Sequence, residues 1–379
     1  MAKVTQFKEL SRTKKKKSGL KAFLIFLPIA AVSIFLSVFW NDVAELFVGS
    51  GPKGSFPVSI TNGTPKQIAQ LGNYFAVSTS ANLSIYNRSG GVVQTILHGY
   101  TNPVLQTNDK YTLLYDRGGK GLRIDNRTKN LRIEKFDSQI ITAELSSDGA
   151  FAVVTASRQY LNELIVYDKG YEVIFKWSSM NENIVKTAFT KDGKGIVVAA
   201  VAPNADGEIT SSLYYFSFQK NELVATQKVE NACIIDISIK SANEFVAVFD
   251  TLIAKFKLQT MQMEEKYLFE PKQLISFDID SPNHSAIALT NNVKDTLCEI
   301  IVLSDSFQEA CRVSDVHALK SVKCHENKLC ILTDSAFMCY QVSGAAIKNN
   351  DAIIANAFVA IKENIYLLGY SEINQLTIH

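Results

Sequence analysis

Positive charge and glycine occur together in residues 116–121 of this chain (DRGGKG). The backbone amides of a glycine-rich loop can hold an anion, and Arg117 and Lys120 would add positive charge to that site. No helical pattern follows, so the stretch lacks the helix N-terminus on which phosphate loops depend. A β-turn with solvated charges explains the same residues, and both interpretations remain open. The candidate binding residues are Asp116, Arg117, Lys120 and Arg123, with Asp206 from a second, longer loop.

The histidines and cysteines show no metal-binding pattern. No two of the five histidines have ligand spacing, and no Cys/His cluster has zinc geometry. Among the six cysteines, a two-residue turn at Asp334 and Ser335 would set Cys330 opposite Cys339. Such a pair could form a disulfide, or it could pack as two buried thiols. We leave both states open and expect no metal and no cofactor.

Two carboxylates, Asp278 and Asp280, alternate along a predicted strand and therefore point to the same side of it. Such a pair could serve acid–base chemistry or bind calcium, and it could equally cap the turn that begins at Ser281. No G-x-S-x-G nucleophile motif occurs in the chain. The sequence offers no catalytic constellation, so we predict that the protein is not an enzyme.

The N-terminal region has the charge pattern of a membrane anchor. Residues 1–21 contain eight basic residues and one acid, and residues 22–40 form a run of 19 without a charge. Such a run can cross a hydrocarbon core of about 30 Å as a helix. A cleaved signal peptide, the alternative, has a shorter apolar core and small residues at its cleavage site. Basic residues stay in the cytoplasm, so we predict the N-terminus inside and the remainder outside.

These patterns divide the chain into four parts. They are a basic cytoplasmic tail (1–21), a transmembrane helix (22–40), a linker (41–55) and an extracytoplasmic domain (56–379). We expect this single-pass protein in the cytoplasmic membrane, with the lipid bilayer as a partner of residues 22–40. The net charge of +2 gives no reason to expect nucleic acid as a partner.

Beyond residue 56 the sequence repeats a unit of short strands. Turn signals recur 36 to 50 residues apart, each between apolar runs of alternating pattern. Residues 140–177 are the clearest copy, with four strands and Asp148-Gly149 in the first hairpin turn. Four strands in about 40–45 residues are typical of a β-propeller blade. We predict an all-β domain, an eight-bladed β-propeller, with seven blades as the alternative. The turn signals are Gly72-Asn73, Asn108-Asp109, Asp148-Gly149, Asp192-Gly193, Ala242-Asn243, Pro282-Asn283, Glu326-Asn327 and Glu363-Asn364.

The last repeat, residues 353–378, has room for only three strands. Residues 56–60 form a strand without a partner, so we predict that they complete the last blade and remove two open sheet edges. We call the face that carries the connections between blades the top face, and the opposite one the bottom face. Closure in this way brings the chain in at the bottom face, and the top face is expected to look away from the membrane.

The Lys-rich tail with its 19-residue span, residues 114–121 (LYDRGGKG) and Ser147-Asp148-Gly149 resemble a family of bacterial proteins catalogued as a domain of unknown function. Its members, common in Gram-positive anaerobes, have a short basic N-terminus, one membrane helix and an extracytoplasmic propeller. The resemblance implies that layout here and supplies no activity. The repeats are more distantly similar to quinoprotein and WD-repeat propellers, although the chain has two tryptophans and no Trp-Asp dipeptide.

We therefore expect a non-enzymatic binding or scaffold module that offers its top face to a protein, peptide or glycan outside the cell. The alternative is a propeller enzyme (a hydrolase, lyase or quinone-type oxidoreductase) with its site at the mouth of the central channel. Several carboxylates or a metal at that mouth would favour the alternative.

Overall fold

The computed structural model describes residues 52–292, 294 and 296–378. The chain divides into two compact units, Met1–Gly51 and Pro52–His379, and all described residues belong to the second. The predicted tail and transmembrane helix therefore lie outside the described residues. Within the described part, no helix has the length and apolar character needed to cross a membrane.

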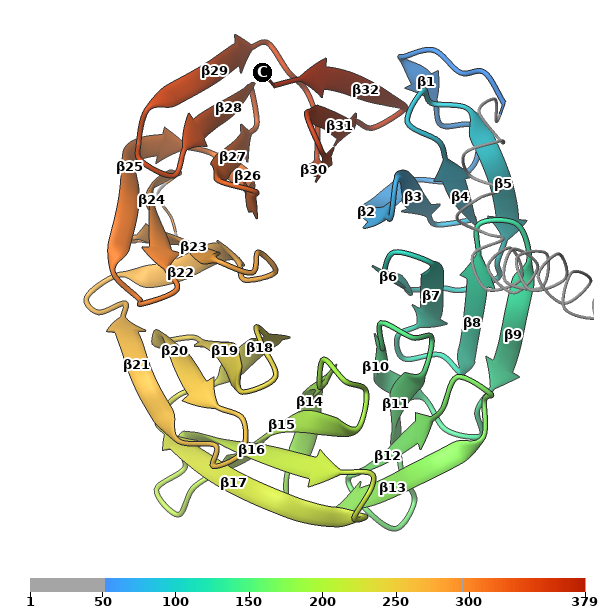
Figure 1. The fold of residues 1–379 in the computed structure, drawn as a ribbon, viewed down its shortest axis with the longest axis vertical. Coiled ribbons are helices and arrows are strands. Elements are labelled where there is room, and N and C mark those ends of the chain that lie inside the picture. Colours follow the sequence, from blue (N-terminus) through green and yellow to red (C-terminus); the bar gives the residue numbers. More distant parts are fainter. Residues whose placement is uncertain (1–51, 293, 295, 379) are drawn as a thin grey trace, which may run out of the picture. The chain divides into compact units, whose positions relative to one another are not determined.

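The second unit is an eight-bladed β-propeller, which confirms the predicted fold. Eight four-stranded antiparallel sheets are arranged in a ring, with the first strand of each blade innermost (Figure 1). Blades one to four are β2 to β5 (Pro65–Leu71, Tyr74–Thr79, Asn82–Tyr86, Val92–Leu97), β6 to β9 (Pro103–Thr107, Tyr111–Asp116, Gly121–Asn126, Asn130–Lys135), β10 to β13 (Ile140–Leu145, Phe151–Ala156, Asn162–Tyr167, Val173–Ser179) and β14 to β17 (Asn183–Phe189, Gly195–Pro203, Ile209–Ser217, Glu222–Glu230). Blades five to eight are β18 to β21 (Ile234–Ile239, Glu244–Phe249, Leu252–Lys257, Met263–Leu268), β22 to β25 (Gln273–Asp278, His284–Thr290, Leu297–Ser304, Glu309–His317), β26 to β29 (Leu319–His325, Lys328–Thr333, Ala336–Gln341, Ala346–Asp351) and β30 to β32 with β1 (Ala357–Ile361, Asn364–Leu368, Glu372–Thr377, Val58–Ser59).

The apolar core consists of layers between adjacent blades. The second strand of blade three, β11 (FAVVTA), is buried at every position but the last, whereas the outer strand β9 (NLRIEK) has no buried residue. One layer joins blades two and three, where Leu113 and Leu122 belong to the same cluster as Ala143 and Phe151. A single blade would leave such a layer in water, so the blades stabilise one another only within the ring.

The hairpin turns follow the sequence signals closely, and one loop differs. Gly149 has a φ of +96°, the left-handed conformation that the Asp148-Gly149 turn requires. The longer loop expected around Asp206 is mostly strand, because β15 and β16 continue to the pair Pro203↔Ile209. Only residues 204–208 turn there, and the hairpin of blade four is therefore longer than expected.

The N-terminal strand closes the ring as predicted. Strand β1 pairs with β32 in the register Val58↔Ile373, and the amide of Ile60 donates to the carbonyl of Ser371 at 2.8 Å. The paired segment, Val58–Ser59, is shorter than the predicted strand 56–60 because the preceding residues pack toward blade one. The last blade thus draws its outer strand from the beginning of the domain.

Aromatic side chains join the first blade to the last. The ring of Phe75 stacks on Tyr86 of its own blade and on Tyr366 of blade eight, with centroids 5.2 and 4.5 Å apart. The hydroxyl of Tyr366 donates to the carbonyl of Arg88 at 3.1 Å. Packing and hydrogen bonding therefore both support the closure.

The chain enters the propeller at the bottom face. The side-chain amide of Asn87 donates to the carbonyl of Pro52 at 2.9 Å. Asn87 lies in the turn between the third and fourth strands of blade one, which belongs to the bottom face because the strands alternate in direction. The top face is thus on the opposite side of the ring from Pro52.

Candidate functional site

Exposed apolar side chains are concentrated on the top face. Of the sixteen large hydrophobic residues that are exposed in the described part of the chain, ten lie in top-face loops or at the strand ends beside them. Four others lie at the bottom ends of outer strands, and two lie in mid-strand. The ten, which we call the top-face apolar set, are Leu97, Tyr160, Leu161, Met180, Ile209, Ile235, Leu268, Leu297, Ile354 and Tyr370.

Several members of the top-face apolar set lie on loops that hydrogen bonds hold together. Ile354 and Tyr370 are 69% and 67% exposed, and their loops are joined by the amide of Asn356, which donates to the carbonyl of Leu368 at 2.7 Å. The amide of Leu161 donates to the carbonyl of Ser179, next to Met180, at 2.9 Å. These backbone hydrogen bonds hold the loops in one arrangement, which lowers the entropy cost of ordering the loops when a partner binds.

The predicted glycine-rich loop is a turn on the top face of blade two. It is tied to blade three by two backbone hydrogen bonds, from Gly118 to Ile140 at 2.8 Å and from Ile140 to Gly119 at 2.7 Å. The carboxylate of Asp116 is buried and accepts the amide of Asn102 at 2.7 Å. Asp116 therefore has a structural role, and the amides of Gly118 and Gly119, which donate to the carbonyls of Ile140 and Asp116, are not available to an anion.

The charged side chains of that prediction do not form one cluster. Arg123 makes a bidentate ion pair with the buried carboxylate of Asp125, with both N–O distances 2.7 Å. Arg117 and Lys120 are exposed on the loop. Asp206 is exposed in the turn of blade four, and blade three lies between it and the loop. A binding role for these five residues stays a prediction.

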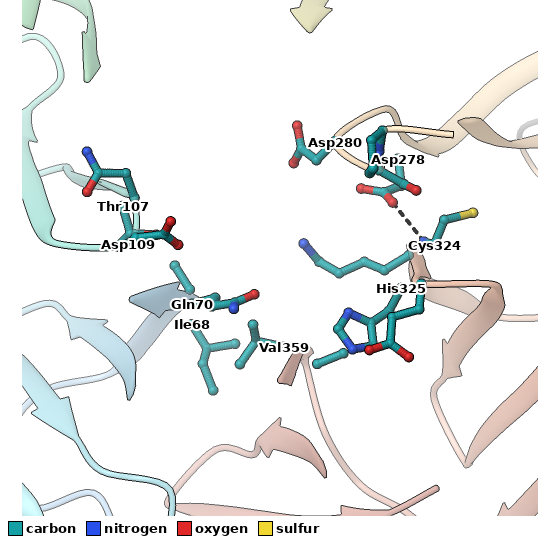
Figure 2. A pocket seen from close by; sticks show the side chains of 16 residues that line it. Ile68, Gln70, Thr107, Asp109, Asp278, Asp280, Cys324, His325 and Val359 are labelled. Atoms are coloured by element: carbon teal, nitrogen blue, oxygen red, sulfur yellow. Dashed lines mark hydrogen bonds between the residues drawn. The ribbon is translucent and has the colours of Figure 1, made fainter. Parts of the chain in front are cut away.

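A cavity of about 550 Å³ opens at the bottom mouth of the central channel. Its walls come from the inner strands and first turns of blades one, two, six, seven and eight. Four carboxylates and one ammonium group line it, and Asp109 approaches from the side opposite to Asp278 and Asp280 (Figure 2). We call it the mouth cavity. The charged lining residues are Asp109, Asp278, Asp280, Glu326 and Lys323.

One carboxylate of the mouth cavity is fixed by the fold. Oδ2 of Asp278 accepts the backbone amide of Cys324 at 2.7 Å, which joins blade six to blade seven. Burial raises the pKa of Asp278, while the positive charge of Lys323 acts in the opposite direction. Lys240 lies behind the cavity and donates to the carbonyls of Ile279 and Ser281. Burial lowers the pKa of Lys240 despite the nearby Asp280.

A second charged group lies on the inner strands of blades three, four and five. Burial raises the pKa of Glu144 to about 7, although Lys186 and a hydrogen bond from Gln106 favour its charged form. The ammonium of Lys186 lies 2.9 Å from a carboxylate oxygen of Asp236. Opposite charges on the inner strands of neighbouring blades four and five thus form an ion pair.

The predicted cysteine pair lies on neighbouring strands of blade seven, β27 and β28. The register Cys330↔Cys339 is confirmed, and the two sulfur atoms are 3.7 Å apart as buried free thiols. Among the described residues, no group of three or more His, Cys, Asp or Glu side chains could hold a metal ion. A disulfide and a pair of buried thiols were both left open by the sequence, and this geometry is compatible with the thiol pair.

Sequence reasoning found two of the five charged residues that line the mouth cavity. Asp278 and Asp280 both line the cavity, although β22 ends at Asp278 and Asp280 lies in the turn after it rather than on the predicted strand. Asp109, Lys323 and Glu326 were missed, because Asp109 and Glu326 stood out only as turn signals. The signal was nevertheless present: first hairpin turns of different blades all meet at the bottom mouth of a propeller.

Comparison with known proteins gives a family and a fold. A family described as of unknown function (DUF5711) matches residues 55–376. No curated protein matches the sequence significantly. Sqt1 of Saccharomyces cerevisiae is 8% identical and superposes with a TM-score of 0.62 over 86% of this chain and 100% of its own. The C-terminal WD40 domain of Sif2 is 9% identical, with a TM-score of 0.62 over 87% of this chain and 100% of its own. BamB from Moraxella catarrhalis is 11% identical, with a TM-score of 0.55 over 84% of this chain and 100% of its own. At these identities the likeness concerns the fold alone.

Proposed function

The chain belongs to the DUF5711 family, whose function is unknown, and we propose that it is a membrane-anchored binding module that catalyses no reaction. In this proposal residues 22–40 anchor it in the cytoplasmic membrane with the N-terminus inside. The propeller then lies outside the cell and presents its top face to a protein partner. The anchor rests on the sequence, and the docking face rests on the surface described above.

The observation that carries the proposal is the unequal distribution of exposed apolar side chains. A large apolar surface on one face of a folded domain marks an interaction site, because water contact with such a surface is costly. The top-face apolar set extends over most blades, which fits a broad protein surface better than the narrow groove a glycan or single peptide would need. The rigid ring holds this set in one arrangement.

The enzyme alternative is favoured by one feature, the four carboxylates at the mouth cavity. The candidate nucleophile beside them is Cys324 and the candidate base is His325, and both have environments unsuited to catalysis. Burial and the neighbouring Asp278 raise the pKa of the Cys324 thiol, whereas a thiol nucleophile needs a lowered one. Nε2 of His325 is 2.9 Å from the carbonyl oxygen of Lys362, and that contact occupies one ring nitrogen. We therefore assign the cavity a binding role rather than a catalytic one.

Photo-cross-linking in cells tests the docking face. A photoreactive amino acid is placed at Ile354 or at Tyr370 in the full-length chain, with Lys129 in a bottom-face turn as the matched exposed control. We expect an adduct of constant mass from the two top-face positions and none from Lys129. Adducts from Lys129 alone would show that the partner binds the bottom face, and the proposal would be wrong.

Labelling with a membrane-impermeant maleimide tests the location. The variants are Asp206→Cys in the propeller and Lys16→Cys in the tail, each with Cys233→Ser to remove the native thiol that is only half-buried. In intact cells we expect reaction at position 206 and protection at position 16. The reverse pattern would contradict the proposed orientation.

A further inference from the structure

Basic residues are concentrated on one part of the bottom face. In blades one to four, the turn between the third and fourth strands and the first two residues of the fourth strand form a segment at the outer edge of this face. We call these four segments, residues 87–93, 127–131, 168–174 and 218–223, the basic rim. It contains five basic residues and three acids, a net charge of +2, whereas the equivalent segments of blades five to seven (258–264, 305–310 and 342–347) contain three acids and no basic residue. The charged residues of the rim are Arg88, Arg127, Lys129, Lys169 and Lys220 with Asp168, Glu172 and Glu222.

The basic rim also exposes large apolar side chains. Four of its residues are between 41% and 46% exposed, namely Val92, Val173, Ile174 and Leu223. In the equivalent segments of blades five to seven no large apolar residue is exposed, and four are buried: Leu258, Met261, Phe307 and Val342. Positive charge and exposed apolar surface therefore occur on the same half of the bottom face and are both missing from the other half.

Three lysines of the rim occupy equivalent places in neighbouring blades. Lys129, Lys169 and Lys220 are exposed in the turns that precede β9, β13 and β17. These strands are the outermost ones of consecutive blades (Figure 1). The nearby carboxylate of Asp168 is used within its own turn, where Oδ1 accepts the amides of Gly170 and Glu172 at 2.8 and 2.9 Å. The lysines thus form a row along one edge of the ring.

The chain enters the propeller beside this rim. The carbonyl of Pro52 accepts the side-chain amide of Asn87, and a β-carbon built on Gly54 would lie 2.2 Å from the carbonyl carbon of Gly90. Residues 52–54 therefore pack on the blade-one part of the rim. The eleven residues 41–51 separate Pro52 from the apolar run 22–40, and they can span at most about 40 Å. A membrane that holds residues 22–40 is consequently within reach of the rim.

We propose that the basic rim docks on the anionic lipid headgroups of the membrane that holds residues 22–40. The inference rests on the anchor in the proposed function. Lysine ammonium groups pair with lipid phosphates, and the exposed valine, isoleucine and leucine side chains enter the boundary between headgroups and acyl chains. Because the rim occupies one half of the bottom face, the docked propeller is tilted, with blades two to four closest to the bilayer. Contact with lipid adds no protein at position 129, so Lys129 remains a valid control for a protein partner.

Quenching of a fluorescent label by brominated lipids tests the docking. The full-length chain with Cys233→Ser, which removes the least buried native thiol, is labelled at Thr128→Cys on the rim. The matched position is Ser343→Cys, exposed in the equivalent turn of blade seven. Each protein is reconstituted in vesicles of phosphatidylcholine and in vesicles of equimolar phosphatidylcholine and phosphatidylglycerol.

A triple variant tests the row of lysines. It carries Lys129→Gln, Lys169→Gln and Lys220→Gln. The matched control removes the same charge from first hairpin turns of the same face, with Lys110→Gln, Lys191→Gln and Lys194→Gln.

We expect strong quenching at position 128 and weak quenching at position 343 in the mixed vesicles. Three ammonium groups near an anionic surface favour the docked state roughly 100-fold, so the rim triple variant should lower quenching at position 128 to its value in phosphatidylcholine. The control triple variant should leave it unchanged. Equal quenching at positions 128 and 343, equal effects of the two triple variants, or no quenching at position 128 in mixed vesicles would each overturn the proposal.

Flotation of the full-length chain with phosphatidylcholine vesicles at high salt tests the anchor separately, because salt screens the attraction between charges. A chain that does not float under these conditions would contradict the anchor. Quenching at position 128 in the mixed vesicles still decides whether the rim docks, so the two failures are distinguishable.

Discussion

The side chain of Val58 lies directly against Gly90, so closely that a β-carbon at Gly90 would come within 2.6 Å of Val58 Cγ2. Val58 belongs to the strand that completes blade eight, and Gly90 belongs to a bottom-face turn of blade one. Gly90 also has a φ of +83°. The closure of the ring therefore depends on the absence of a side chain at this position.

Replacement of Gly90 should weaken the closure. Gly118 offers a matched control, because it has a φ of +79° and no atom within 4 Å of a built β-carbon. Both Gly90→Ala and Gly118→Ala impose the same left-handed strain, and only the first adds a steric clash. We expect Gly90→Ala to lower the free energy of unfolding by about 1–3 kcal/mol more than Gly118→Ala, in urea titrations of the full-length chain. Equal losses would show that Val58 does not pack there.

The Glu144 carboxyl should make stability depend on pH. Its pKa is raised from 4.5 to about 7 in the folded chain. Between these values the folded state holds a proton that the unfolded state has released, so the free energy of unfolding falls as pH rises. In Glu144→Gln this contribution disappears. Relative to the parent, we expect the variant to gain about 3 kcal/mol between pH 4.5 and pH 8.

Unfolding titrations at several pH values provide the measurement. Glu172→Gln, at an exposed position, serves as the control and should give a curve parallel to the parent. If the free energy of unfolding of Glu144→Gln depends on pH in the same way as that of the parent, the interpretation is wrong. Lys186 remains paired with Asp236 in this variant, so a general loss of folding is not expected.

The Cys330 and Cys339 thiols should stay reduced in the native protein. Both side chains are fully buried, so an oxidant or an exchanging thiol cannot reach either sulfur atom while the protein is folded. We expect thiol reagents to modify the less buried Cys233 first and to reach this pair only after unfolding. Mass spectrometry of unreduced digests provides the check, and a peptide pair linked through residues 330 and 339 would contradict the expectation.

The repeat could be predicted from the sequence because each blade encodes its own first hairpin. Signals such as Asp148-Gly149 depend only on neighbouring residues, and their spacing gave the number of blades. The pairing of Val58 with Ile373 was predictable for another reason: three strands at one end and one at the other leave a single economical arrangement.

The mouth cavity could be predicted only in part. Asp278 ends β22 and Asp280 follows it in the turn to β23, so their closeness in sequence already places them near each other. Asp109 comes from a different blade, and its position relative to Asp280 is set by the geometry of the whole ring. The same reason explains why Asp206 could not be placed relative to Asp116, since blade three lies between them.

The assignment of the top and bottom faces depends on the pairing of the N-terminal strand with β32. Ser59 and Glu372 are exposed partners in this pairing, so the double variant Ser59→Cys, Glu372→Cys measures it directly in the full-length chain. Ser59→Cys with Asn130→Cys on blade two is the control. After mild oxidation we predict a peptide pair linked through residues 59 and 372 and none in the control. If positions 59 and 372 both react with a thiol reagent yet never link to each other, the ring is not closed by this strand and the assigned faces are wrong.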